Sequence, residues 1–347
     1  MASNIFSKVG IFSSILNIAF TKKSIPLTVH INVTNTCNLK CSYCYGTYDK
    51  RDTKDFTTEQ LLALIDELKS LGTKIINLGA GEPLMRKDIE QVIDYIRKNG
   101  IECHMNTNGH LVPQRLSAVK KLNTLCISLD GDEQSHDLYK GKGSYRKVIE
   151  AIDLAKKNNI NVHTSTMISK YNVHAIEHIL DLAKEKKFFV QFLLPFFQSN
   201  QDFLASREDY KNALRKIIDY KKKGYPVFFS KQAHQYTLDW PDYNKKSIEA
   251  GAIKDFGRHI KCHAGKNMCI IDSDGKVYPC SQMIQMIPAL SFVEHGFIRA
   301  WENIKDHSCK TCYAFICFND YNMLLGLSPH VILNHIKNSF IEAGWRK

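Results

Sequence analysis

The chain has 347 residues, of which 44% are hydrophobic, so it can bury the core of one large domain or of two smaller ones. Its 47 Lys and Arg against 35 Asp and Glu give a net charge of +12, but no recognised nucleic-acid module accompanies that charge, and no nucleic-acid partner is expected. No stretch reaches the roughly 18 apolar residues of a membrane span, and the N-terminus lacks the features of a signal peptide, so a cytoplasmic location is expected.

The first 20 residues predict an amphipathic helix. Apolar side chains recur at helical intervals between residues 4 and 20, and Lys22-Lys23 follow. Packing on the body of the protein is the ordinary role of such a stripe. Peripheral membrane contact is the alternative, and it would bring a lipid-linked substrate within reach.

From residue 27 onward, strand and helix patterns alternate. Strands are predicted at 27–33, 74–78, 101–106, 124–129, 161–168 and 188–194, and helices at 57–71, 88–98, 113–122, 144–158 and 174–186. This βα repeat predicts an α/β fold with a parallel sheet, whose reactive groups gather at the carboxyl ends of the strands. The alternation weakens after about residue 200, where a helix is expected at 205–223, and one or two closing helices are expected after residue 318.

Three cysteines, Cys37, Cys41 and Cys44, lie on the loop that follows the first strand. The chain holds eleven cysteines in close groups, which favours metal ligation in a reducing compartment over disulfides. Three thiolates this close can ligate three irons of a cubane cluster and leave the fourth iron without a protein ligand. A zinc knuckle or a chance group of buried thiols is the alternative.

Polar turns follow the next three predicted strands. They read Gly79-Ala80-Gly81-Glu82-Pro83, Asn106-Thr107-Asn108-Gly109 and Ser128-Leu129-Asp130-Gly131. Each is by itself an ordinary turn. Their recurrence at three successive strand ends predicts a common site at that edge of the sheet.

A second group of cysteines follows residue 260. Cys262 and Cys280 flank a hairpin signal, and Cys309, Cys312 and Cys317 come later. Four thiolates leave no open metal position, which suits electron transfer or a structural role, with zinc as the alternative to iron. Of the other cysteines, Cys269 could also reach this site, whereas Cys103 and Cys126 are expected in the core.

The spacing Cys-x3-Cys-x2-Cys, with Tyr43 before the last cysteine, resembles the signature of the radical S-adenosylmethionine (SAM) superfamily. This resemblance implies a partial (βα)6 barrel and a [4Fe-4S] cluster on Cys37, Cys41 and Cys44 whose open iron binds SAM. Reductive cleavage of SAM would give a 5'-deoxyadenosyl radical that abstracts a hydrogen atom from substrate. The resemblance further implies cofactor contacts from Gly81, Glu82, Asn106, Thr107, Asn108, Ser128 and Asp130.

Within these contacts, Glu82 would accept hydrogen bonds from the SAM ammonium, and Ser128 and Asp130 would bind ribose hydroxyls or substrate. Ala80 replaces a glycine that is usual in the family, which bears on how closely the backbone can approach there.

The second cysteine region resembles the SPASM or twitch extension, which carries auxiliary clusters. The resemblance implies one auxiliary [4Fe-4S] cluster on Cys262, Cys280, Cys309 and Cys312, with Cys317 as a competing ligand. Ser281 stands where sulfatase-maturing relatives carry an Asp base, which argues against that reaction. The expected domains are an N-terminal helix at 1–25, the barrel at 26–230 and the auxiliary-cluster domain at 231–347.

We therefore predict a radical SAM enzyme that acts on a small-molecule or lipid-linked substrate, because only about 25 residues precede the first strand. A partner such as flavodoxin or ferredoxin would supply the electron. Modification of a ribosomally synthesised peptide is the alternative, and a non-catalytic iron-sulfur or zinc scaffold is the alternative of another class. The sequence identifies no catalytic residue that handles the substrate proton.

Overall fold

The computed structural model describes residues 2–44, 46, 51, 54–195, 201–241, 243, 260–305 and 316–345. By its internal contacts the chain divides into two compact units. Unit 1 comprises residues 1–40, 46–126 and 263–307, and unit 2 comprises residues 41–45, 127–262 and 308–347. Cys37 therefore belongs to unit 1, whereas Cys41 and Cys44 belong to unit 2. The domain boundaries expected from the sequence stay a prediction.

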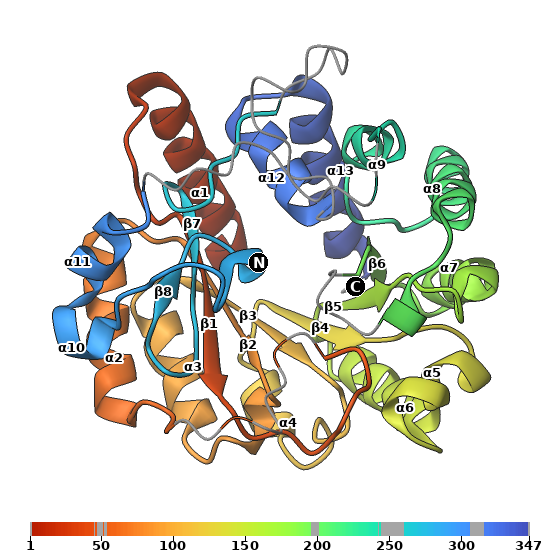
Figure 1. Cartoon of the computed structure of the whole chain (residues 1–347), viewed down its shortest axis with the longest axis horizontal. Helices are drawn as coiled ribbons and strands as arrows, with labels where there is room; N and C mark the ends of the chain where they lie inside the picture. The colour runs from red at the N-terminus through yellow and green to blue at the C-terminus, as the bar shows by residue number, and fades with distance from the viewer. Residues whose placement is uncertain are drawn as a thin grey trace. The chain divides into compact units, whose positions relative to one another are not determined.

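Unit 1 contains the strand order β3-β2-β1-β7-β8 (Figure 1). Its strands are β1 (Thr28–Thr34), β2 (Ile75–Ala80), β3 (Glu102–Thr107), β7 (Met268–Ile271) and β8 (Val277–Tyr278). Its helices are α1 (Ala2–Thr21), α2 (Thr58–Ser70), η2 (Pro83–Met85), α3 (Ile89–Lys98), α4 (Leu116–Val119), η5 (Ser281–Met283), α10 (Phe292–His295) and α11 (Phe297–Glu302). The β1, β2, β3 and β7 pairings are parallel, and the β7–β8 pair is the predicted antiparallel hairpin.

Unit 2 contains the order β6-β5-β4 (Figure 1), of which β4 begins in unit 1. The strands are β4 (Thr124–Ser128), β5 (Val162–Met167) and β6 (Phe189–Leu193). The helices are α5 (Glu133–Lys140), α6 (Ser144–Lys157), η3 (Val173–Ala175), α7 (Ile176–Lys186), η4 (Gln201–Phe203), α8 (Arg207–Lys222), α9 (Lys231–Leu238), α12 (Ile316–Leu325) and α13 (Pro329–Trp345). The alternating order from β1 to β6 confirms the predicted α/β class with six βα repeats.

The strands of unit 1 carry different chemistry on their two faces. Val29, Ile31 and Val33 of β1 are fully buried, and they alternate with His30 and Asn32 because successive strand residues point to opposite faces. The register extends this second face across the sheet, since His30 pairs with Asn77 of β2 and Asn77 pairs with His104 of β3. We call His30, Asn32, Asn77 and His104 the polar face of unit 1.

One predicted helix is shorter in the structure, and several short helices were not predicted. The predicted helix at 113–122 is reduced to α4, because residues 109–115 form turns in which the Val112 amide donates to Gly109 O at 3.2 Å. Helices α5 and α9 were not predicted, since neither eight-residue sequence shows a long apolar stripe. Their starts are fixed by caps, in which Asp132 and Ser230 accept hydrogen bonds from backbone amides.

Among the helices in the described part of the chain, none combines the length and the apolar character needed to cross a membrane.

The half-buried His30 and the fully buried His234 make the stability of the fold depend on pH. Burial lowers the pKa of His30 on β1 and of His234 on α9 from 6.5 to about 4. The unfolded chain therefore takes up protons as the pH falls below 6.5, while the folded chain does not until about pH 4, so stability is lost across this window. We expect a loss of about 3 kcal/mol per histidine. Urea unfolding from pH 7 to 4.5 measures it.

The control for this pH dependence is Gln235→Ala, which lies next to His234 on α9 and removes no titratable group. We expect His234→Gln to make the unfolding free energy less steep in pH and Gln235→Ala to leave the slope unchanged. Equal slopes in the two variants would contradict the assignment to burial.

Candidate active site

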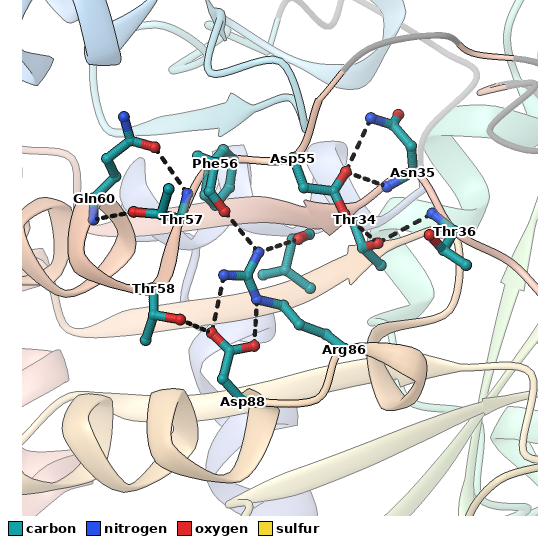
Figure 2. Close-up of polar contacts among 11 residues, drawn as sticks. Thr34, Asn35, Thr36, Asp55, Phe56, Thr57, Thr58, Gln60, Arg86 and Asp88 are labelled. Atoms are coloured by element: carbon teal, nitrogen blue, oxygen red, sulfur yellow. Dashed lines mark hydrogen bonds and ion pairs between the residues drawn. The ribbon is translucent and has the colours of Figure 1, made fainter.

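The loop that carries the three cysteines leaves β1 through residues 33–36 and returns to α2 through residues 54–58. We call these two segments the outgoing and the returning stem. Figure 2 shows side chains of both stems together with Arg86 and Asp88, which follow η2. Thr57 of the returning stem begins α2 through a capping box with Gln60.

One guanidinium joins the two stems (Figure 2). Nη1 of Arg86 donates to Val33 O of the outgoing stem at 2.8 Å and to Phe56 O of the returning stem at 3.0 Å. Nε and Nη2 donate to the two carboxylate oxygens of Asp88 at 2.7 and 3.0 Å. The Arg86 side chain is only 9% exposed. A buried arginine with bidentate pairing is strongly oriented, so Arg86 fixes the distance between the two ends of the loop.

Asp55 makes a second connection between the stems (Figure 2). Its Oδ1 accepts hydrogen bonds from the Asn35 amide at 2.8 Å and from Asn35 Nδ2 at 3.0 Å, and its Oδ2 accepts one from Thr34 Oγ1 at 2.5 Å. Thr34 Oγ1 in turn accepts a hydrogen bond from the Thr36 amide at 3.0 Å. The backbone is therefore held up to the residue before Cys37.

The turn after β2 lies against the outgoing stem. The Glu82 amide donates to Thr36 O at 2.8 Å. A Cβ atom at Gly81 would lie 2.3 Å from the same oxygen, so only glycine permits this approach. Ala80 has a φ of +83°, in the left-handed region that favours glycine. The substitution noted in the sequence thus leaves backbone strain at Ala80, while the close contact itself falls on Gly81.

The Glu82 carboxylate ties the turns after β2 and β3 together. This buried group accepts hydrogen bonds from Thr107 Oγ1 at 2.8 Å, from the Asn108 amide at 2.8 Å and from the Leu84 amide at 3.1 Å. Asn108 Nδ2 donates to Oδ1 of Asn38, the residue after Cys37, at 2.7 Å. The structure therefore brings together four predicted cofactor-binding residues of unit 1, namely Gly81, Glu82, Thr107 and Asn108. Asn106 lies beside them, exposed at the end of β3.

In unit 2, Asp130 binds protein groups with both carboxylate oxygens. Its Oδ2 accepts a hydrogen bond from Tyr43 Oη at 2.5 Å, and its Oδ1 accepts one from the Met167 amide at 2.9 Å. The Lys140 ammonium lies 3.6 Å from Oδ2 and 5.2 Å from the centre of the Tyr43 ring. Asp130 thus orients the aromatic residue that precedes Cys44. Ser128 is half-buried at the end of β4, and the cofactor roles of both residues stay predictions.

The charge on Lys140 influences two of the thiols. Burial raises the pKa of Cys41, and the nearby Lys140 ammonium opposes that rise. Burial also disfavours the charged form of Lys140, but Asp130 and the thiols of Cys41 and Cys44 outweigh it, so the pKa of Lys140 is raised. Lys140 therefore stays protonated at neutral pH and favours thiolates, the form in which cysteine ligates metal.

Five residues with structural roles escaped the sequence analysis. Asn38, Asp55, Arg86 and Asp88 belong to none of the motifs identified there. Lys140 lies on α5, a helix that the pattern did not reveal. The only available signal was the position of Asn38 and Arg86 beside motifs already identified.

We expect Arg86→Gln to loosen the cysteine loop. The change leaves Asp88 without its cation and weakens the bonds to two backbone carbonyls, which should cost about 2–4 kcal/mol of unfolding free energy. Iron retained per chain after anaerobic reconstitution and gel filtration should also fall. The matched control is Arg146→Gln, which removes an exposed ion pair with Glu133 of 2.7 Å and should cost under about 1 kcal/mol. Equal iron content in both variants would contradict the role assigned to Arg86.

The second cysteine group is described only in part. Cys280 immediately precedes η5 in unit 1, and Cys262 and Cys317 belong to unit 2; all three thiols are half-buried. Cys309 and Cys312 lie outside the described residues. The auxiliary ligand set therefore stays a prediction.

The remaining described cysteines behave as core residues. Cys103 and Cys126 are buried, as predicted, and Cys269 is buried in β7, where burial also raises its pKa. Within the described ranges, no three Cys, His, Asp or Glu side chains are grouped closely enough to hold a metal ion. Ligation by Cys37, Cys41 and Cys44 thus rests on their spacing, their chemistry and the anchored loop.

Comparison with known proteins places this geometry in context. The family model of the radical SAM superfamily matches residues 31–183. The AdoMet-dependent heme synthase of Methanosarcina barkeri is 28% identical over 293 residues, which cover 80% of this chain and 82% of that protein. The Fe-coproporphyrin III synthase of the same organism is 35% identical over 173 residues, covering 48% and 43%. The mycofactocin maturase MftC of Mycobacterium tuberculosis is 27% identical, covering 80% and 71%.

Solved structures share the fold. Streptococcus suis SuiB bound to S-adenosylmethionine superposes with a TM-score of 0.65 at 17% identity, covering 82% of this chain and 68% of SuiB. The protein anSMEcpe with bound AdoMet superposes with a TM-score of 0.59 at 18% identity, covering 89% and 98%. Both likenesses support the α/β architecture predicted from the sequence.

Proposed function

We propose that this chain is a radical SAM enzyme, which uses a [4Fe-4S] cluster and SAM, and that it abstracts a hydrogen atom from an unactivated C–H bond of a small-molecule or lipid-linked substrate. The family match over residues 31–183 and the enzymes among its relatives support the class. The observation that carries the proposal is the close contact between the Gly81-Glu82 turn and Thr36, which holds the start of the cysteine loop against a turn predicted to bind cofactor. A barrel of parallel strands gathers its reactive groups at such strand ends.

The residues present fit the two groups that the family implies. Cys37, Cys41 and Cys44 offer soft sulfur ligands for three irons. Gly81 lets the turn lie against Thr36, beside the start of the cysteine loop. Glu82 carries the carboxylate that the resemblance assigns to the SAM ammonium group, and Thr107 and Asn108 hold that carboxylate in place. When bound and reduced, the cluster and SAM supply a 5'-deoxyadenosyl radical for hydrogen abstraction.

The protein's own groups would position and protect this chemistry. Arg86 and Asp55 hold the two stems, so the two ends of the loop are fixed in place for cluster binding. Lys140 favours the thiolate of Cys41. An electron would come from a partner of the flavodoxin or ferredoxin type, and an auxiliary cluster on the second cysteine group would give or accept a further electron.

A small polar substrate is supported by the polar face of unit 1. His30 stays neutral at pH 7 because burial lowers its pKa to about 4, so it can donate or accept a hydrogen bond without carrying charge. Oδ1 of Asn77 is buried and has no hydrogen-bond partner within the described residues. The match to the heme synthase covers 80% of this chain and 82% of that protein. A tetrapyrrole is therefore the first class of substrate to test.

A peptide substrate is the second candidate. The mycofactocin maturase relative, which also matches four-fifths of this chain, favours it. A lipid-linked metabolite is a third possibility, because α1 forms as predicted and carries exposed apolar residues.

The deciding experiment follows hydrogen transfer under anaerobic, reducing conditions. The reconstituted enzyme is mixed with SAM and either deuterated iron coproporphyrin or a deuterated precursor peptide, and 5'-deoxyadenosine is analysed by mass spectrometry. We expect deuterium in 5'-deoxyadenosine with the tetrapyrrole. Label from the peptide alone would favour the maturase function, and an absence of any 5'-deoxyadenosine would overturn the enzyme assignment.

A further inference from the structure

Helix α13 is held to unit 2 by polar side chains. Nδ2 of Asn334 and Nδ2 of Asn338 both donate to Phe228 O, at 3.0 and 2.8 Å. Nε2 of His335 lies 2.6 Å from Oδ2 of the buried Asp320. One turn and a half of the helix therefore packs through amide and imidazole groups where a globular protein ordinarily uses apolar ones.

The polar contacts of α13 with unit 2 continue toward the end of the helix. Oε1 of Glu342 lies 2.8 Å from Nε2 of the buried His163. Asn334, Asn338 and Glu342 follow helical spacing, so they form one polar stripe directed into unit 2.

The outer face of α13 is apolar. Leu333, Ile336 and Phe340 are 62%, 47% and 75% exposed, and their spacing of three and four residues places them in one row. Single exposed apolar residues are ordinary, whereas a continuous row marks an interaction surface. The inner side of α13 is therefore polar between Asn334 and Glu342, with buried Val331 before this stretch and Trp345 packed on Phe189 after it, while the outer side carries the exposed apolar row. We call Leu333, Ile336 and Phe340 the α13 row.

The exposed charge on α13 itself is positive. The only acidic residue of α13 is Glu342, which is buried against His163, whereas Lys337 is exposed next to Ile336. The whole chain carries +12. A second copy of the chain would bring like charges together, but anionic lipid headgroups would attract them.

Helix α1 also combines exposed apolar side chains with nearby positive charge. Phe12 and Phe20 are exposed, the helix contains no acidic residue, and exposed Lys22 and Lys23 follow its last turn.

We propose that the α13 row docks the protein on an anionic lipid surface. The helix would lie in the plane of the interface, with Leu333, Ile336 and Phe340 among the acyl chains and Lys337 at the headgroups. This inference goes beyond the proposed function and does not depend on it, because it requires neither the cluster nor SAM.

The test is co-sedimentation of the full chain with vesicles. We expect the protein to bind vesicles of phosphatidylcholine and phosphatidylglycerol, and to bind pure phosphatidylcholine less, with salt weakening the anionic preference. Leu333→Ser combined with Phe340→Ser should lower the partition coefficient at least about tenfold, because two large apolar groups leave the interface. The matched control is Leu138→Ser on α5, a side chain 61% exposed and outside the row, which should bind as the wild type does.

A second variant guards against misfolding of the double mutant. Lys337→Glu keeps the α13 row and should weaken binding to anionic vesicles only. Equal vesicle binding by wild type and double variant would overturn the proposal. It would also be overturned if the wild type ignored vesicles but formed dimers in analytical ultracentrifugation that the double variant did not form, since the row would then bind a second copy.

Discussion

Replacing Cys37, Cys41 or Cys44 with alanine should abolish the formation of 5'-deoxyadenosine from SAM. Each substitution removes one of three thiolates that would hold the cluster and exposes a second iron to solvent. The anchored stems cannot compensate, because Arg86 and Asp55 fix the backbone and supply no ligand of their own. Product yield by mass spectrometry and iron per chain after anaerobic reconstitution measure the effect, which we expect to exceed about a thousandfold in rate.

The control for these variants is Cys103→Ala. Cys103 is fully buried in β3, so its loss creates a small cavity and lowers stability, but it should leave SAM cleavage intact. If the three loop variants retained cleavage, or if Cys103→Ala abolished it, the cluster would be held elsewhere and the assignment would fail.

The part of the site in unit 1 could be predicted because its residues lie in short motifs at strand ends. Parallel strands bring their carboxyl ends to one edge, so the turns at Gly81-Glu82 and Thr107-Asn108 had to come close together once β2 and β3 were recognised. Their hydrogen bonds confirm this convergence. Nothing more than strand order and turn composition was needed.

The partners of these motifs could not be predicted, because they are distant in sequence or chemically ordinary. Tyr43 and Asp130 are 87 positions apart, and Lys140 reaches Asp130 from a helix without an apolar stripe. The hydrogen bonds from Arg86 to two backbone carbonyls cannot be recognised in the sequence, because every residue has a backbone carbonyl.

The closing helices show a second limit. Apolar residues in the tail correctly predicted helices, of which the structure contains α12 and α13. Helical periodicity cannot say which face turns inward when polar side chains find buried partners, as Asn338 does with Phe228. Ile336 would have been assigned to the core, but it is exposed.

Gly81→Ala should weaken SAM binding and cleavage while leaving the cluster ligands in place. The new methyl group would lie 2.3 Å from Thr36 O, so the turn must move away and the bond from the Glu82 amide to the same oxygen is lost. Movement of Glu82 also disturbs Thr107 and Asn108, which it binds. We expect at least about a tenfold higher Kd for SAM and roughly a hundredfold slower cleavage, measured by equilibrium dialysis and product formation.

The control for Gly81→Ala is Gly10→Ala on α1, where an added methyl group meets no neighbouring atom within 4 Å. That variant should bind and cleave SAM as the wild type does, because alanine is a better helix former and meets no obstacle. Ala80→Gly tests the same turn in the opposite direction, since it relieves the positive φ without removing a contact and should raise stability slightly. If Gly81→Ala kept its iron and also its affinity for SAM, the turn after β2 would not be part of the cofactor site, and Glu82 would serve only to join two turns.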